Sequence, residues 1–327
     1  MTTYNGEKFV KKQLQSILNQ TKKPDEVIIV DDCSTDDTVE IVRDFIRSNS
    51  LLTWELIILP ENKGFINSFN RAILKTSGDI IFLCDQDDVW LSDKVEIMSK
   101  IMVENPKIIA LASGFHKIDS DDKRINSFTN PFTSNNNLIR KIIKDGECVK
   151  IDLRQVIIYN ISPGCTSAFK SVIKEVLKEL EEPRFNLVHD WKINIIAAGM
   201  DGLYFLNTPA TNYRLHETNA IGLTRTYSIN YRIDLYKKGC IDREFMINLL
   251  EKMMALRNIN NRNNLTENLN LIIEIRENLF QKIAALNKGS IKDYLLMLSK
   301  FDFFKTRMIE GWVIDIIIIL KNKFSWI

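Results

Sequence analysis

The first half of the chain alternates between two hydrophobic patterns. Apolar residues recur at helical spacing over residues 7–18, 34–46 and 62–74. Short apolar runs at 26–30, 56–59 and 80–84 are of the type found in strands buried on both faces. Strands alternating with helices predict a parallel sheet with right-handed crossovers. We therefore expect an α/β fold with a mostly parallel, Rossmann-like sheet flanked by helices.

The pattern changes twice further along the chain. From about residue 110 to 222 it is mixed, and we expect strands at 108–115, 156–161 and 203–206 among loops such as the polar segment 134–137. From about residue 225 onward the spacing is helical, with an Asn-rich break at 258–264. These changes predict a first domain over residues 1–222 and a helical C-terminal extension over residues 223–327.

The beginning of the sequence departs from this pattern. A doubly wound sheet needs a strand before Thr2, where only Met1 stands. We therefore expect the first strand of the sheet to be missing from this sequence.

Composition narrows the class of protein. A net charge of +2 without a long basic stripe argues against a nucleic-acid-binding protein. Five scattered cysteines without a C-x-x-C pair argue against a disulfide framework or a zinc site, and suit reduced cytosolic thiols. The polar beginning does not read as a signal peptide, and no apolar run approaches the ~20 residues that span a bilayer. We expect a cytoplasmic protein.

Three carboxylates in four residues follow the apolar run 80–84 directly: Asp85, Asp87 and Asp88. Like charges repel, and a buried carboxylate needs a partner or a metal. Mg²⁺ would relieve that cost, since it is usually bound by one or two carboxylates plus substrate phosphates. Ligands of open α/β sheets lie at the carboxyl ends of the strands, which is where this segment falls. The alternative is that Asp88 caps a helix beginning at 89–91.

Nine short motifs occur in one order over residues 1–222. They are TTYNG at 2–6, SILNQT at 16–21, VDDCSTD at 30–36, NKG at 62–64, SGD at 77–79, DQDDVW at 85–90, PGCT at 163–166, HDW at 189–191 and YRLH at 213–216. Together they resemble the family-2 glycosyltransferases of the GT-A fold. The DQDD, HDW and YRLH motifs look most like the bacterial rhamnosyltransferase-like branch, which builds surface polysaccharides.

This resemblance implies a site for a nucleotide-sugar donor. Thr2, Tyr4 and Asp32 would line the base pocket, and Asp85 would face the ribose. The chemistry is suitable, because a carboxylate can accept from a pyrimidine N3–H and a tyrosine ring can stack on the base.

The resemblance also implies a divalent metal, Mg²⁺ or Mn²⁺, bound by Asp87. His216 would complete the metal shell or bind the diphosphate. Arg214 would pair with phosphate, or equally form a salt bridge with the acidic loops.

For the reaction itself, the resemblance points to Asp190 as the general base that takes the proton of the acceptor hydroxyl. The alternative is that Asp190 only caps the helix that follows. Trp191 would pack or serve as a platform for the acceptor sugar. A floor near the acceptor or the diphosphate would be formed by Gly164, Cys165 and Thr166.

The C-terminal tail carries a separate signal. Residues 282–327 hold eight Lys or Arg and four Asp or Glu, and an apolar run at 312–320 precedes Lys321, Lys323, Phe324 and Trp326. A short apolar helix with a basic flank and terminal tryptophans suits an interfacial helix on an anionic membrane. A core helix or a dimer contact is the alternative. With the first reading, we expect the protein to be peripheral at the inner face of the plasma membrane.

The function implied by the resemblance is inverting, metal-dependent sugar transfer. The donor is a nucleoside-diphosphate sugar, with dTDP-rhamnose as one candidate, and the acceptor is a saccharide or lipid-linked molecule in cell-surface polysaccharide synthesis. Two alternatives remain: a nucleotidyltransferase, or a non-catalytic carbohydrate-binding protein derived from a glycosyltransferase. The sequence leaves the donor sugar, the linkage and the oligomeric state open.

Overall fold

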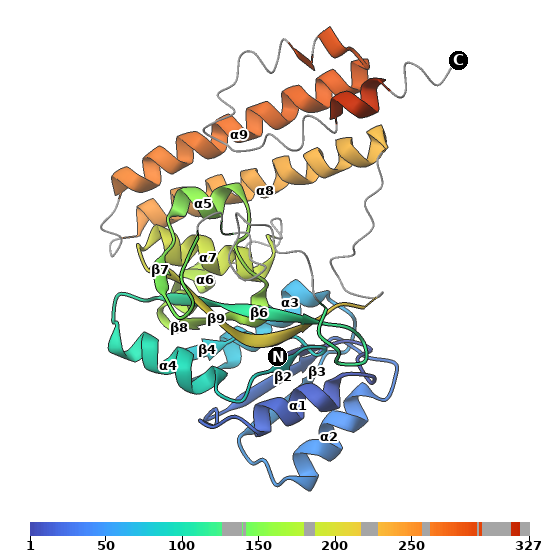
Figure 1. The fold of residues 1–327 in the computed structure, drawn as a ribbon, viewed down its shortest axis with the longest axis vertical. Coiled ribbons are helices and arrows are strands. Elements are labelled where there is room, and N and C mark those ends of the chain that lie inside the picture. Colours follow the sequence, from blue (N-terminus) through green and yellow to red (C-terminus); the bar gives the residue numbers. More distant parts are fainter. Residues whose placement is uncertain are drawn as a thin grey trace. The chain divides into compact units, whose positions relative to one another are not determined.

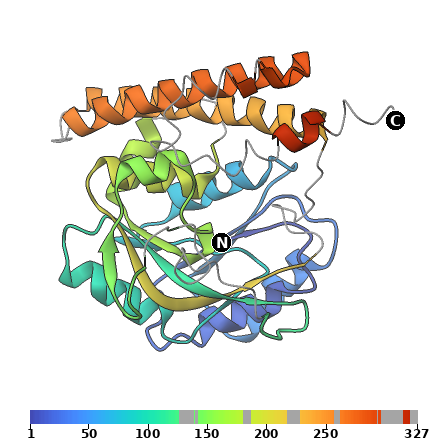
Figure 2. The same cartoon turned by 45° about the horizontal axis from the view of Figure 1, so that its top comes forward.

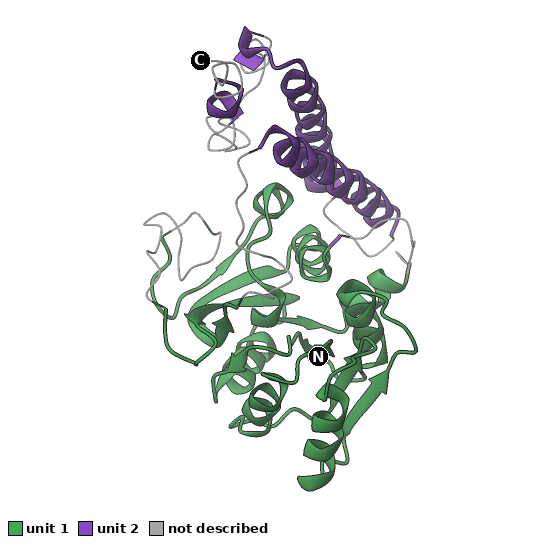
Figure 3. Cartoon of the chain, turned by 90° about the vertical axis from the view of Figure 1, so that its right-hand side faces the viewer, with its two compact units in different colours: residues 1–181, 188–219 green, residues 182–187, 220–327 purple. Residues whose placement is uncertain are grey.

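The computed structural model describes residues 1–125, 139, 142–179, 187–216, 228–256, 262–292, 294–295 and 315–320. The chain forms two compact units, one of residues 1–181 and 188–219 and one of residues 182–187 and 220–327, coloured separately in Figure 3. The predicted boundary at 222–223 and the loop expected at 134–137 lie outside the described residues.

The N-terminal part of unit 1 is a parallel three-stranded sheet in the order β1 (Thr2–Thr3), β2 (Val27–Asp31) and β3 (Trp54–Ile58). The connecting helices are α1 (Val10–Leu18) and α2 (Thr38–Ser48), and α3 (Phe65–Lys75) follows β3 (Figure 1). Val10, Leu14 and Ile17 recur on one face of α1 and are buried against the sheet residues Val27 and Ile29. The register aligns the carboxyl ends of the strands, so that the loops after them meet at one edge.

A second, mixed sheet forms the rest of unit 1. Its order is β4 (Ile80–Phe82), β8 (Ser167–Lys170), β6 (Ala110–Ile118), β9 (Leu203–Arg214) and β5 (Val89–Trp90), and β7 (Cys148–Lys150) also pairs with β9. Only β6 and β9 pair in parallel among these strands. Its helical segments are α4 (Lys94–Glu104), α5 (Leu153–Ile158), the 3₁₀ turn η1 (Gly164–Thr166), α6 (Val172–Glu179) and α7 (His189–Gly199). The α/β fold is confirmed, with the parallel part confined largely to the first sheet.

One predicted strand and one alternative are wrong. The strand expected at 156–161 begins inside helix α5, which ends at Ile158, because Leu153, Val156 and Ile157 form a buried helical face. The helix that the alternative for Asp88 placed at 89–91 is strand β5, which pairs antiparallel with β9, and the helix begins only at Lys94. In both segments an apolar run was too short for its periodicity to separate helix from strand.

The strand expected to be missing is represented by the two residues of β1. The Thr2 N–H donates to the Cys84 carbonyl at 3.3 Å, and Thr2 pairs with Val30 of β2 on the other side. A cavity of about 310 Å³ lies between β2 and the segment that contains β4, lined by residues 25–28 on one side and 78–84 on the other. None of the candidate site's carboxylates lines this cavity.

Unit 2 is helical in the described residues. Helices α8 (Ile229–Ala255) and α9 (Arg262–Lys288) lie side by side in Figures 1 and 2 and bury apolar residues such as Met246, Leu250, Ile272 and Ile275. A short helix at 315–320 buries Ile318 and Ile319 and leaves Ile317 and Leu320 partly exposed. No helix among the described residues has the length and hydropathy to cross a bilayer.

Candidate active site

The acidic segment after β4 lies at the edge of the sheet and is fixed by its backbone neighbours. Asp88 leads directly into β5 and is 1% exposed. Its Oδ1 accepts a hydrogen bond from the Arg214 N–H at 2.9 Å. The helix-cap alternative for Asp88 is therefore wrong, because no helix begins at 89–91 and the carboxyl faces β9 instead.

Burial and mutual repulsion control the ionisation of this segment. Burial, followed by the charges of Asp88, Asp87 and Asp190, raises the pKa of Asp85 well above its ordinary value. Burial and the neighbouring Asp87 raise the pKa of Asp88 to about 7. The carboxylates thus lack full compensation from the protein, which is the electrostatic condition that a bound cation relieves.

One buried cation lies behind the segment, and the sequence did not single it out. Lys94 is fully buried, and its Nζ donates to the Cys165 carbonyl and to the Thr211 Oγ1, the latter at 2.9 Å. Burial lowers the pKa of this ammonium to about 8. The sequence spacing could have indicated that Lys94 is buried, because Lys94 and Met98 are four residues apart on the buried face of α4.

The two predicted metal ligands lie together. The Asp87 Oδ2 and the His216 Nε2 are 2.8 Å apart, although 129 residues separate them along the chain. His216 stands two residues after the end of β9, and its ring centroid lies 4.9 Å from that of the Phe9 ring. Both side chains keep partial exposure, 19% for Asp87 and 12% for His216. A carboxylate and an imidazole so placed suit a divalent cation such as Mn²⁺ or Mg²⁺.

A further set of ligand atoms lies deeper. One donor atom each from Asp85, Asp88 and Cys165 falls within 4.8 Å of the others. Burial raises the pKa of the Cys165 thiol well above its ordinary value, so the sulfur stays protonated and is a poor ligand for a hard cation. The residues that fit a hard cation are the carboxylates Asp85, Asp87 and Asp88, and of these Asp87 lies beside His216 in a partly exposed pair.

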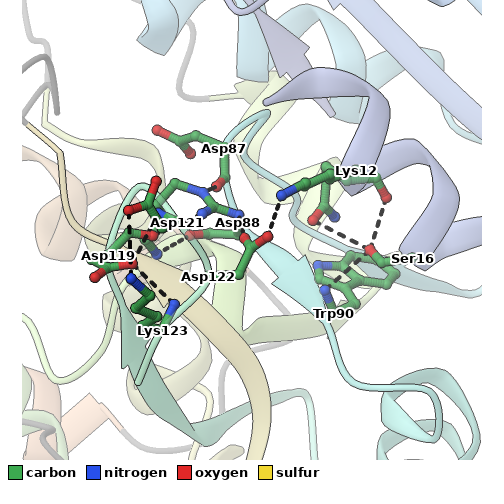
Figure 4. A network of polar contacts seen from close by, with 11 residues as sticks. Lys12, Ser16, Asp87, Asp88, Trp90, Asp119, Asp121, Asp122 and Lys123 are labelled. Atoms are coloured by element: carbon green, nitrogen blue, oxygen red, sulfur yellow. Dashed lines mark hydrogen bonds and ion pairs between the residues drawn. The ribbon is translucent and has the colours of Figure 1, made fainter. Parts of the chain in front are cut away.

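The contacts described for Arg214 join its side chain to other residues of unit 1. Its Nε donates to the Asp87 carbonyl at 2.6 Å and its Nη1 to the Asp119 carbonyl at 2.8 Å. Its Nη2 lies 2.6 Å from the Asp122 Oδ1, and the side chain is 0% exposed. Figure 4 shows Asp119, Asp121 and Asp122 gathered beside Asp87 and Asp88. Of the two alternatives from the sequence, the geometry favours the salt bridge with an acidic loop over phosphate binding.

The residues predicted for the base pocket lie beside the acidic segment. Gln86 links the two, because its side chain accepts from the Tyr4 N–H at 2.8 Å and donates to the Tyr4 carbonyl at 2.9 Å. The close approach requires glycine at position 6, where a Cβ would lie 2.1 Å from the Gln86 Oε1. Tyr4 itself is 45% exposed, so its ring is available for stacking. Sequence reasoning had assigned Gln86 no contact.

Asp32 and Thr2 are more enclosed. Asp32 is 3% exposed, and its Oδ1 accepts from the Lys63 N–H at 2.7 Å. Thr2 is 8% exposed within β1. The neighbouring Asp31 accepts from the Thr3 and Ser34 hydroxyls and so supports the loop that follows β2.

Asp190 lies in the first turn of α7, far along the chain from the acidic segment but close enough in space for its charge to act on Asp85. It is 7% exposed, and burial raises its pKa to about 6. The Trp191 N–H, the Gly164 N–H and the Asn160 side chain bond to the carboxyl and partly offset that rise. The N-cap position itself is Val188, so Asp190 is inside the helix.

The neighbours of Asp190 are packed closely. The His189 ring stacks on Phe69 with 3.7 Å between centroids, and burial lowers its pKa to about 3, so that the ring is neutral. A Cβ at Gly164 would lie 2.9 Å from the His189 Nε2 and 3.2 Å from the Asp190 Cβ. Gly164 is therefore required for η1 to approach the start of α7.

The remaining predicted residues serve this packing. The Trp191 Nε1 donates to the Val156 carbonyl at 2.6 Å and joins α7 to α5, which fits the packing alternative. The Thr166 Oγ1 donates to the Pro163 carbonyl at 2.8 Å within η1. Cys165 is buried against the acidic segment.

Comparison with known proteins identifies the family of the chain. Residues 1–181 match the family model described as glycosyl transferase family 2. A dTDP-rhamnosyl transferase of Shigella flexneri, RfbG, is 28% identical over 247 residues, which cover 71% of this chain and 77% of that protein. A putative teichuronic acid biosynthesis glycosyltransferase of Bacillus subtilis, TuaG, is 32% identical over 102 residues, which cover 31% of this chain and only 40% of that protein.

Solved structures show the same fold. The crystal structure of Staphylococcus aureus TarS 1–349 in complex with UDP has a TM-score of 0.58 at 15% identity, covering 98% of this chain and 89% of that one. That likeness supports the architecture alone. With the family match over more than half of the sequence, it establishes that the chain belongs to glycosyl transferase family 2 and has its GT-A fold.

Proposed function

We propose that the protein is an inverting, metal-dependent glycosyltransferase that uses a nucleoside-diphosphate sugar. The observation that carries the proposal is the placement of two carboxylate groups with different surroundings at one edge of unit 1. The Asp87–His216 pair is partly exposed beside Tyr4's segment, whereas Asp190 is buried on α7 within electrostatic reach of Asp85. Asp87 with His216 suits the binding of a cation and a diphosphate, whereas Asp190 suits the acceptance of a proton.

The proposed reaction is a single displacement. The acceptor hydroxyl oxygen attacks the anomeric carbon while the bond from that carbon to the diphosphate oxygen breaks, and the hydroxyl proton passes to the Asp190 carboxylate. Attack opposite the leaving group inverts the anomeric centre. A divalent cation bound by Asp87 and His216 would supply charge neutralisation for the departing diphosphate.

On the donor side, Tyr4 would stack on the base, Asp32 and Thr2 would meet its edge, and Asp85 would face the ribose. Asp32 has one oxygen engaged by Lys63, which leaves the other as an acceptor for a base N–H. The relative named as a dTDP-rhamnosyl transferase, aligned over 71% of this chain, supports dTDP-rhamnose as the first donor to test. The acceptor would be a saccharide or a lipid-linked saccharide in polysaccharide synthesis.

The assay is a panel of nucleotide-sugars with release of nucleoside diphosphate as the readout, with Mn²⁺ and with EDTA. We expect release with one donor or a few, lost in EDTA and restored by Mn²⁺. Full activity in EDTA would contradict the metal role. Binding without release for every donor and acceptor would favour the non-catalytic carbohydrate-binding alternative. Family membership argues against the nucleotidyltransferase.

Membrane association is a second part of the proposal. The partly exposed Ile317 and Leu320, 46% and 37%, lie on the short helix before the basic end of the chain, whereas its buried Ile318 and Ile319 support the core-helix alternative for the other face. We expect Ile317→Ser with Leu320→Ser to reduce co-sedimentation with anionic liposomes. Leu52→Ser, at a 97% exposed position of unit 1, is the matched control. Equal sedimentation of all three proteins would oppose docking through this helix.

A further inference from the structure

The carboxyl group of Asp190 is held by donors from three separate segments. The Trp191 N–H at the start of α7 donates to its Oδ1 at 2.6 Å. The Gly164 N–H of η1 and the side chain of Asn160, in the segment after α5, are further donors. The backbone donors are fixed by the fold, whereas the Asn160 amide can rotate and must be oriented.

A second asparagine gives the Asn160 amide its orientation. The Asn194 Nδ2 donates to the Asn160 Oδ1 at 3.0 Å. With its oxygen engaged, the Asn160 amide turns its NH₂ group to the Asp190 carboxyl. Asn194 lies one helical turn after Asp190 on α7 and is 1% exposed, so water cannot replace it easily.

We propose that Asn160 is a positioning residue for Asp190 and that Asn194 orients it. The relay Asn194–Asn160–Asp190 keeps the carboxylate ionised and holds the Asp190 side chain in one rotamer. This inference rests on the proposed function, in which Asp190 accepts the proton of the acceptor hydroxyl.

The charges around Asp190 explain why such a relay is needed. The Asp85 carboxyl from the loop after β4 repels a second negative charge, as its own raised pKa shows. The adjacent His189 is neutral, because burial and the nearby Lys192 lower its pKa. Burial is the largest influence on Asp190, and it opposes ionisation. The hydrogen bonds to the carboxyl oppose that effect, and Asn160 provides the side-chain contribution.

The first test is Asn160→Ala, read as the pH profile of kcat/KM. A hydrogen bond to a charged group contributes about 1.5–3 kcal/mol, and 1.36 kcal/mol corresponds to one pKa unit. We expect the acidic limb of the profile to move up by about one pH unit. The maximal kcat should fall while the KM of the donor stays within about twofold, because the donor does not contact Asn160 in this proposal.

Asn194 supplies a sharper test. Asn194→Leu removes the orienting donor and should move the limb in the same direction by less than Asn160→Ala does. Asn194→Asp offers only acceptor oxygens, so the Asn160 NH₂ should turn away from Asp190 and the limb should move further than in Asn194→Leu. Part of that movement comes from the new charge. Asn194→Asp in the Asn160→Ala background measures this charge effect alone.

Thermal melts separate positioning from simple packing. If Asn160→Ala lowers the melting temperature but leaves both the acidic limb and kcat unchanged, Asn160 is only structural and the inference is wrong. A limb that moves equally for Asn194→Asp with and without Asn160 would exclude the orienting role. Failure of the proposed function looks different: Asp190→Asn would retain turnover. If Asp190→Asn is inactive while Asn160→Ala behaves as the wild type, the relay is wrong and Asp190 remains the general base.

Discussion

In the part of the chain that the structure describes, a site in unit 2 and the acidic segment in unit 1 both bury carboxylates, and they compensate the negative charge in opposite ways. In unit 2, Asp315 is 0% exposed and its Oδ1 lies 2.6 Å from the Arg232 Nε. The hydroxyls of Tyr236 and Tyr294 donate to its Oδ2. The charge is paired and both oxygens are hydrogen-bonded, which is the condition under which a buried ion pair is tolerated.

In unit 1, the acidic segment after β4 is compensated only in part. The pKa values of Asp85 and Asp88 are raised by burial and by the neighbouring carboxylates, and the buried Lys94 has its own pKa lowered to about 8. This difference distinguishes a buried carboxylate that stabilises the fold from buried carboxylates that suit a functional site. A buried charge matched inside the protein supports the fold, whereas an unmatched group of like charges at a sheet edge suits an external cation.

Removal of Asp87, the partly exposed carboxylate of the acidic segment, should have the largest effect on activity. Asp87→Ala should lower kcat/KM by about 10⁴-fold, equivalent to about 5 kcal/mol, because the cation that neutralises the diphosphate loses its main ligand. The melting temperature in EDTA should hold or rise, since a repelling charge is gone. Asp121→Asn, with a side chain 73% exposed in the nearby loop, is the control and should stay active. Normal turnover by Asp87→Ala would contradict the distinction between the two sites.

The matched site should respond in stability instead. Asp315→Asn leaves Arg232 buried without its counter-charge and should cost about 3–4 kcal/mol, within the range for breaking a buried pair. Urea unfolding followed by far-UV circular dichroism measures the loss. Asp234→Asn in α8, where the carboxylate is 72% exposed and 3.4 Å from Lys237, should change stability by less than about 0.5 kcal/mol. Equal losses for the two variants would mean that burial of the pair contributes nothing.

The acidic segment should also make the stability of the protein depend on pH. Asp88 has a folded-state pKa of about 7, above the unfolded value of about 3.9, so the folded state binds more protons between these limits. Its contribution is fully present below about pH 4 and is lost as the pH rises through 7. In EDTA we expect stability to fall by about 2 kcal/mol between pH 5 and 7.5, measured by urea midpoints. Asp88→Asn should make that slope shallower, and the slope that remains belongs to Asp85 and Asp190, whose pKa values are also raised. A slope equally steep in Asp88→Asn would assign the titration elsewhere.

The sequence predicted the first sheet better than the second. The strands at 27–31 and 54–58 are apolar runs between amphipathic helices, so local pattern and tertiary role agree. Val89 and Trp90 form a strand only because β9, more than 100 residues later, supplies the partner. Such a pairing leaves no periodicity in a two-residue segment.

The candidate site shows the same limit. Asp87, His216 and Asp190 could be proposed from the sequence because carboxylate and imidazole chemistry and the motif order mark them. The roles of Gln86, Lys94 and Asn160 depend on contacts with segments far away in the chain, such as Gln86 with Tyr4 across 82 residues. Arg214 had two open roles, and only its contacts with Asp119 and Asp122 distinguish them.

The most direct test of the central claim is a calorimetric titration of Mn²⁺ into the wild-type protein, Asp87→Ala, His216→Ala and Asp190→Asn, at pH 7.5. The account predicts one Mn²⁺ site per chain in the wild type and in Asp190→Asn, and at least a tenfold weaker site in Asp87→Ala and in His216→Ala. Binding that is unchanged in Asp87→Ala, or lost in Asp190→Asn alone, would contradict the assignment of the unmatched carboxylates to a cation and of the α7 carboxylate to proton transfer.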